Sequence, residues 1–218
     1  MANYTYLVND IINACENDGT EFANYVPKMI NRAEERLTRD LDDYGLVSYT
    51  SVAIPAGANQ VTLPSGTRIL KNFNIVANST RINLLPRTDE YIRDYWPVSA
   101  STGTPEYYAR RNNTTVLIAP TPVSTFDGEI VHISRPTTLA AATPNNYFSD
   151  FCYDALFNAC MVEAMIFQKD YNASNLFEQR YMQAIATLQN QARRTRRDDM
   201  EAPASRAGAD NPVIAGSN

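Results

Sequence analysis

The spacing of the apolar residues changes twice along the chain, and this change restricts the possible folds more than any other feature. Near both ends the apolar residues recur every three or four positions, the spacing of one face of an α-helix. Between about residues 47 and 147 they alternate with polar residues, and Pro, Gly, Asn and Thr become frequent. That composition is typical of short strands joined by turns. The sequence therefore predicts an α+β protein with helices at both ends and a β-rich middle.

Two helices are predicted before the β-rich region. Thr5 to Glu16 holds apolar residues near helical spacing and ends at the turn signal Asn17-Asp18-Gly19. Pro27 is expected in the first turn of the second helix, where its missing N–H costs no hydrogen bond. The second helix carries a longer apolar stripe, formed by Phe22, Val26, Met29, Ile30, Ala33, Leu37 and Leu41.

The middle region reads as a series of short strands. Val47–Ile54 alternates, Pro55–Asn59 turns the chain, and Gln60–Leu63 returns it, which predicts a hairpin. Asn112-Asn113 predicts a second tight turn further along. Short strands at this spacing are typical of a small sandwich or a partly closed barrel.

The C-terminal part returns to helices at Phe148. Between Phe151 and Phe167 only three residues are polar, so we expect this helix to be buried on most sides. The run is shorter than the roughly 20 apolar residues of a membrane span and contains two acidic residues, so we expect no membrane segment. A last helix is expected from Asn172 to about Arg197.

Each pair of terminal helices leaves one apolar face uncovered, which the other pair can cover. We therefore expect residues 1–46 and 148–200 to form one helical bundle. Residues 47–147 are expected to be a β-rich insertion in that bundle, and residues 201–218 an extended C-terminal tail with little to bury.

The chain offers few residues suited to catalysis. Its one histidine, His132, has Ser134 two positions later on the same face of a strand, but no Gly-X-Ser-X-Gly motif accompanies them. We expect His132 to be a packing or surface residue. Cys15, Cys152 and Cys160 are odd in number and lack the close pairs of a zinc site, so we expect neither disulfides nor a metal. The sequence also lacks a phosphate loop and a dinucleotide fingerprint, and no cofactor is predicted.

The one run of basic residues lies at the end of the last predicted helix and consists of Arg193, Arg194, Arg196 and Arg197. Three interpretations are open: phosphate contacts with DNA, a solvated helix end, or a contact with an acidic protein partner. The net charge of −5, from 19 basic and 24 acidic residues, argues against DNA binding over the whole surface. The acidic pairs Asp42-Asp43 and Asp198-Asp199 are interpreted as solvated helix ends.

The order of several segments is more specific than any single motif. They are Val26–Leu41, Trp96, Gly103–Tyr108, Val116–Pro122, and Phe157–Asp170 followed by Phe177-Glu178-X-X-Tyr181. In this order, over about residues 22–195, they resemble head-to-tail adaptor proteins of tailed double-stranded-DNA bacteriophages. This connector family is related to the tubular tail protein of short-tailed phages.

The resemblance implies a non-enzymatic virion protein of the neck, or head-tail junction, assembled in the host cytoplasm and needing no cofactor. It implies a homo-oligomeric ring, commonly of about twelve copies, that joins the portal protein to the tail or nozzle protein. DNA would pass through the ring without specific binding. We expect the segment Glu201–Asn218 to become ordered on the portal, with Val213 and Ile214 as apolar anchors and the arginine run docking nearby.

Two alternatives to this function stay open from the sequence. One is a tail-side stopper or tail-completion protein with the same combination of helices and strands. The other, from a different class, is a metal-assisted hydrolase or nuclease that uses His132 with Asp and Glu residues.

Overall fold

The computed structural model describes the backbone of residues 3–41 and 46–207, and side chains as far as Arg194. The chain forms two compact units. Its two ends, up to Tyr44 and from Thr137, make a helical unit, and Gly45–Pro136 makes a β unit. The predicted α+β class is confirmed, and the C-terminal helices pack on the N-terminal helices.

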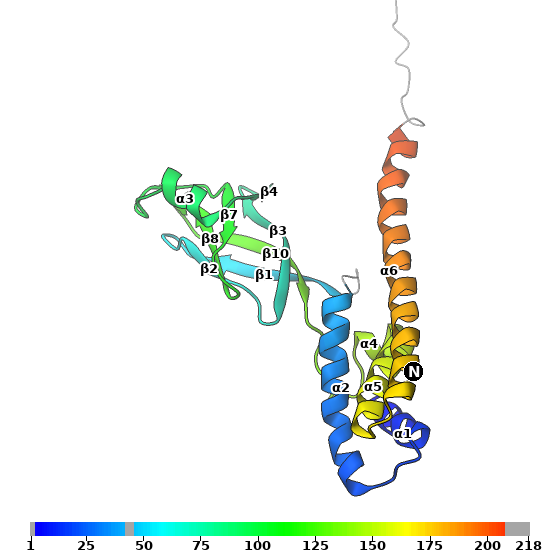
Figure 1. Ribbon diagram of the computed structural model, residues 1–218. Helices are drawn as coiled ribbons and strands as arrows, with labels where there is room; N and C mark the ends of the chain where they lie inside the picture. The colour runs from blue at the N-terminus through cyan, green and yellow to red at the C-terminus, as the bar shows by residue number, and fades with distance from the viewer. Residues whose placement is uncertain (1–2, 42–45, 208–218) are drawn as a thin grey trace, which may run out of the picture. The chain divides into compact units, whose positions relative to one another are not determined.

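The helical unit is built around one buried helix (Figure 1). Its described helices are α1 (Tyr4–Ala14), α2 (Thr20–Asp40), α4 (Tyr147–Phe151), α5 (Tyr153–Phe167) and α6 (Tyr171–Ala207). Both α2 and α6 pack along α5, which is why α5 is apolar almost all round. The apolar stripe predicted for α2 is confirmed, since Phe22, Val26 and Leu37 are almost completely buried. Burial of each such side chain is worth about 1.5–3 kcal/mol.

Two helices differ from the prediction at their ends. Because α2 begins at Thr20, Pro27 lies two turns inside the helix, and its expected place in the first turn is wrong. The helix α6 continues to Ala207, past the predicted end near Arg197. Met200, Glu201 and Ala202 have high helix propensity, which favours this extension. The helix therefore takes in the first part of the predicted tail, and residues 208–218 lie outside the described residues.

The β unit contains two four-stranded sheets. The first has the antiparallel order β1 (Val47–Ile54), β10 (Phe126–Ser134), β3 (Thr67–Ala77) and β4 (Thr80–Asn83). The second has the order β2 (Gln60–Thr62), β8 (Thr115–Ala119), β7 (Tyr107–Arg110) and β5 (Leu85–Pro86). A small third sheet pairs β6 (Thr102–Gly103) with β9 (Thr121–Pro122), and α3 (Asp89–Tyr95) lies between β5 and β6 in the chain.

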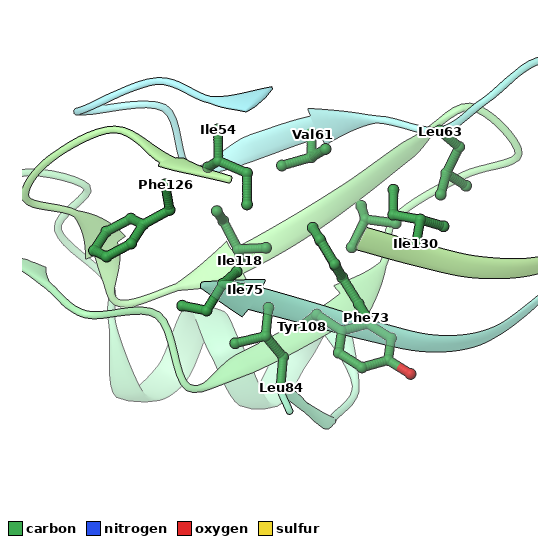
Figure 2. Packing of buried hydrophobic residues seen from close by; sticks show 11 residues of the cluster. Ile54, Val61, Leu63, Phe73, Ile75, Leu84, Tyr108, Ile118, Phe126 and Ile130 are labelled. Carbon is green, nitrogen blue, oxygen red and sulfur yellow. The ribbon is translucent and has the colours of Figure 1, made fainter. Parts of the chain in front are cut away.

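A shared apolar core shows that the two four-stranded sheets form a sandwich (Figure 2). Phe73 and Ile130 come from the first sheet, and Tyr108 and Ile118 come from the second. The ring centroids of Phe73 and Tyr108 lie 6.0 Å apart in an edge-to-face arrangement. This geometry adds to the energy of area burial.

The predicted hairpin between Val47–Ile54 and Gln60–Leu63 is wrong. All eight residues of β1 pair with β10, from Val47 opposite Ile133 to Ile54 opposite Phe126, whereas β2 pairs with β8. The long partner β10 offers β1 a complete ladder, which the three residues of β2 cannot. The turn predicted at Asn112-Asn113 is confirmed, because β7 and β8 on either side of it pair antiparallel.

Candidate functional site

His132 is a structural residue of the sandwich. It is 2% exposed, and its two ring nitrogens each lie 3.1 Å from a threonine hydroxyl, Nδ1 from Thr67 and Nε2 from Thr50. Thr67 donates its own hydroxyl hydrogen to the carbonyl of Pro64 at 2.7 Å. The Thr67 oxygen must therefore accept from Nδ1–H, which leaves Nε2 to accept from Thr50. Burial lowers the pKa of His132 below 6.5, which favours this neutral ring.

The neighbouring serine does not form a catalytic pair with this histidine. The hydroxyl of Ser134 lies 2.8 Å from that of Ser48 on β1. A nucleophilic serine needs a base within hydrogen-bond reach and an open face for substrate, and His132 is instead engaged by two threonines. The packing role expected for His132 is therefore confirmed.

The three cysteines are thiols that form no disulfide, and they are placed for packing. Cys152 and Cys160 are buried at the start and in the middle of α5, and Cys15 is partly buried after α1. Burial raises the pKa of Cys15 to about 11 and that of Cys160 still further, so both are thiols at neutral pH.

In the described part of the chain, no three His, Cys, Asp or Glu side chains come close enough to hold a metal ion. Asp42 and Asp43 lie outside the described residues, and Asp198 and Asp199 lie in α6 beyond the last described side chain. None of the described helices combines the length and the apolar character of a membrane-spanning segment.

The predicted partner-binding residues fall into three groups. Arg193 and Arg194 are exposed on α6. Arg196 and Arg197 belong to the same helix, and their side chains lie beyond the described part. Val213 and Ile214 lie outside the described residues.

The basic run is positioned by a polar network between α2 and α6. Arg36 donates to both carboxylate oxygens of Glu178, Nη1 to Oε2 at 2.7 Å. Its guanidinium also lies 4.0 Å from the ring centroid of Tyr181, and the Tyr181 hydroxyl donates to Asp40 Oδ2 at 2.6 Å. One side of α6 is thereby fixed along the last turns of α2 by charge-assisted and cation–π contacts.

This network shifts the ionisation of its members in the expected directions. Hydrogen bonding to Arg36 lowers the pKa of Glu178, and the same pair raises the pKa of Arg36. Burial, with the hydrogen bond to Asp40, raises the pKa of Tyr181. The ion pair is therefore charged and the tyrosine neutral at physiological pH.

The helix α6 continues beyond the end of α2. Near the end of α2, Gln189 of α6 donates to the backbone carbonyl of Asp40 at 3.0 Å. From residue 190 to Ala207 the helix rises a further 27 Å, roughly, and Figure 1 shows this part passing the C-terminal end of α2. The arginine run sits on this continuing part.

A groove opens beside α6 in the same unit. It has a volume of about 360 Å³ and lies between the α4–α5 junction and the turns of α6 around Ala184, Thr187 and Leu188. Phe151, at its edge, is 68% exposed, and Asp150 and Asp154 bring two carboxylates to the lining. An apolar floor with an acidic rim suits a basic side chain with an aliphatic stem.

The β unit carries a second recess beside an aromatic cluster. The recess has a volume of about 390 Å³ and is lined by Trp96, Arg93 and Arg111, among others. Tyr107 packs on Trp96 with ring centroids 5.3 Å apart, and Arg87 lies over the Tyr107 ring. Trp, Tyr and Arg are the residues enriched at the centres of protein interfaces.

Sequence reasoning missed the polar side chains that hold the helical unit together. Glu34 is 2% exposed, and its carboxylate accepts from the backbone N–H of Leu139 and from Asn146 Nδ2. The sequence does indicate that Glu34 is buried, because Glu34 falls between Ile30 and Leu37 within the apolar stripe of α2. A charged residue in a buried stripe needs a partner, although the sequence does not show which one.

Comparison with known proteins gives one family. The family described as SU10 adaptor protein matches residues 2–207. The match covers both compact units and nearly the whole chain. A comparison with curated proteins gave no match.

Proposed function

Because this chain belongs to the SU10 adaptor protein family, we propose that it forms a ring of about twelve copies between the portal and the tail of a phage. The family membership makes it a structural phage adaptor that connects head and tail, and not an enzyme. The ring, its copy number and its two neighbours are the proposed part.

The observation that carries the proposal is the continuation of α6 past the end of α2, with Arg193 and Arg194 exposed on it. Because α2 ends at Asp40, Arg193 and Arg194 lie beyond it and are exposed, which leaves their guanidinium groups available to a partner. Arginine forks pair with carboxylates, so an acidic protein surface is the partner that fits best.

The charge of the chain fits a DNA conduit that does not hold DNA. The net charge is −5, and repulsion between acidic walls and phosphates lets DNA slide through a channel. If the arginine run binds a protein and not DNA, its positive charges do not slow the passage of DNA. We therefore assign DNA no specific binding site on this chain.

The C-terminal segment is proposed to bind the portal. Val213 and Ile214 are apolar residues in an otherwise polar stretch and would serve as anchors, with the basic run docking nearby. A segment that folds on its partner can reach across a large surface. The β unit is left free for the tail or nozzle protein.

The test is electron microscopy of the purified full chain mixed with its portal. The proposal expects rings seated on the portal, of mass near twelve times 24.4 kDa for the adaptor part. A chain that stays a small oligomer in the presence of the portal contradicts it.

A truncation tests the portal contact separately. Removing Ala202–Asn218 should weaken portal binding and leave the monomer folded, as judged by circular dichroism. A shorter truncation of residues 208–218 keeps all of α6 and is the matched control for helix loss. Portal binding that is unchanged by both truncations contradicts the assignment of this segment.

A further inference from the structure

The groove beside α6 presents features that one copy of the chain leaves unused. Asp154 is exposed and Asp150 half-buried, and no ion pair joins either of them to Arg193 or Arg194, although all four side chains are described. Phe151 packs against Tyr147 with the rings tilted and their centroids 5.2 Å apart, and it still exposes 68% of its surface. Asp150 Oδ1 accepts only a long hydrogen bond of 3.5 Å from Ser149 Oγ, so the groove combines carboxylates that form no ion pair with these arginines and an open aromatic face.

The charges of the helical unit are divided along the chain. Its residues up to Ala192 contain six basic and 14 acidic residues, a net charge of −8. The next five residues, Arg193–Arg197, carry four arginines and no acid. Asp198, Asp199 and Glu201 follow this run, so one copy offers an acidic body and a short basic segment on α6, which are complementary between copies.

The register of α6 separates the two surfaces. Thr187 lines the groove, and Arg193 follows six residues later. At 100° per residue, Arg193 is turned about 120° away from Thr187 around the helix and lies about 9 Å further along it. Arg193 therefore faces away from the groove of its own chain. A groove and an arginine segment on different sides of one subunit make a head-to-tail contact, which gives a ring when the rotation between successive copies closes.

We propose that the groove of one copy receives the basic segment of α6 from the next copy, with Arg193 on Asp154 and against the ring of Phe151. This inference rests on the proposed ring and names the acidic partner of the basic run as a second copy of this chain. The chain already shows the same combination internally, because Arg36 binds the Glu178 carboxylate while its guanidinium lies over the Tyr181 ring. The contact would join charge pairing to aromatic stacking in the same way.

Charge reversal with complementation tests this contact on the full chain mixed with its portal. Asp154→Arg and Arg193→Asp each place like charges at every junction, so each alone should reduce the number of rings on electron micrographs about tenfold or more. An equimolar mixture of the two variants should restore rings, because alternating subunits make every junction complementary. Native mass spectrometry should then find the two variants in equal numbers.

Arg180→Asp is the matched control, since Arg180 is exposed on the same helix and lies over its own Phe177 ring. It should form rings as the unaltered chain does. Circular dichroism of every variant checks that the helices are retained.

Three results would overturn the inference. Single variants that form rings normally would remove the contact and leave the proposed function intact. Single variants that form few rings, with no recovery when they are mixed, would show that Asp154 and Arg193 do not pair between copies. An Asp154→Arg chain that forms free rings but no longer binds the portal would assign the groove to the portal.

An unaltered chain that forms no ring with its portal would instead contradict the proposed function itself.

Discussion

Arg36 on α2 binds Glu178 on α6 through two parallel hydrogen bonds between residues 142 positions apart in the sequence. The same guanidinium covers the ring of the buried Tyr181. This pair sets the rotation of α6 against α2, and with it the direction in which the continuing helix presents its arginines.

Replacing Arg36 with Met should lower the free energy of unfolding by about 1–2 kcal/mol, because both hydrogen bonds and the contact with Tyr181 are lost while Glu178 stays partly buried. Urea unfolding followed by circular dichroism measures this change. Arg32→Met is the control, since Arg32 pairs with Glu163 but its side chain is 56% exposed. That variant should lower stability far less than Arg36→Met does, because solvent screens an exposed ion pair. Equal effects at the two positions would contradict a special role for Arg36.

Glu34→Ala should cost about 2–4 kcal/mol, because it leaves the buried N–H of Leu139 without its acceptor and removes one of the two acceptors of the Asn146 amide, which keeps the Thr137 carbonyl. Asn146 also caps α4 through a reciprocal pair with Ser149. The double variant Glu34→Ala/Asn146→Ala should therefore cost less than the sum of the two single variants. Urea unfolding of the full cycle checks this. The exposed neighbour Glu35 provides a control whose change to Ala stays within about 0.5 kcal/mol.

His132 should make the stability of the protein depend on pH. Burial lowers its pKa in the folded state below 6.5, so the unfolded chain binds a proton first as the pH falls. Stability is then fully present above pH 6.5 and decreases as the pH falls toward the folded pKa. Urea unfolding at a series of pH values measures this slope, and His132→Gln should reduce it. A slope that is the same in both chains between about pH 6.5 and 5 would contradict the assignment.

Glu178 should contribute a separate dependence at lower pH. Its hydrogen bonds to Arg36 lower its pKa below 4.5, so the folded state keeps the carboxylate charged after the unfolded chain has been protonated. This stabilisation is present above pH 4.5 and is lost as the pH falls through the folded pKa. Glu178→Gln should flatten the acid limb of the stability curve below that pH.

Gly128 on β10 should not tolerate a side chain. A Cβ there would lie 3.0 Å from Phe73 Cε2 and 3.1 Å from Ile54 Cδ1, inside the sandwich core. Gly128→Ala should therefore cost about 1–3 kcal/mol, read as a lower Tm. Adding Ile54→Val removes the nearer Ile54 methyl group, so the double variant should be more stable than the sum of the single effects predicts. Simple additivity would contradict this contact.

Local patterns were sufficient to predict many elements. Period-two alternation located β1 with its observed bounds, and the three-to-four spacing located the buried stripe of α2. The absence of a polar face on α5 indicated its burial between other helices. These features depend on neighbours in the sequence, because helix and strand each bring a fixed set of nearby residues to one face.

The sequence alone predicted only part of the candidate site. The arginine run can be recognised in the sequence. The groove that it could occupy is formed by Asp150 and Phe151 together with Leu188 from a later helix. Nothing in either segment alone indicates that they meet. The pairing of α2 with α6 through Arg36 and Glu178 has the same character.

The amino-acid sequence by itself determined the helical ends, the β-rich middle and the faces that must be buried, since apolar periodicity acts over one or two turns or strands. Only the tertiary structure decided that β1 pairs with β10 and not with β2, that Glu34 is satisfied by the returning chain, and that α6 extends past α2. Each of these outcomes depends on which distant segment makes the larger set of contacts. The contacts that two distant segments could make can be compared only once the segments are placed together in space.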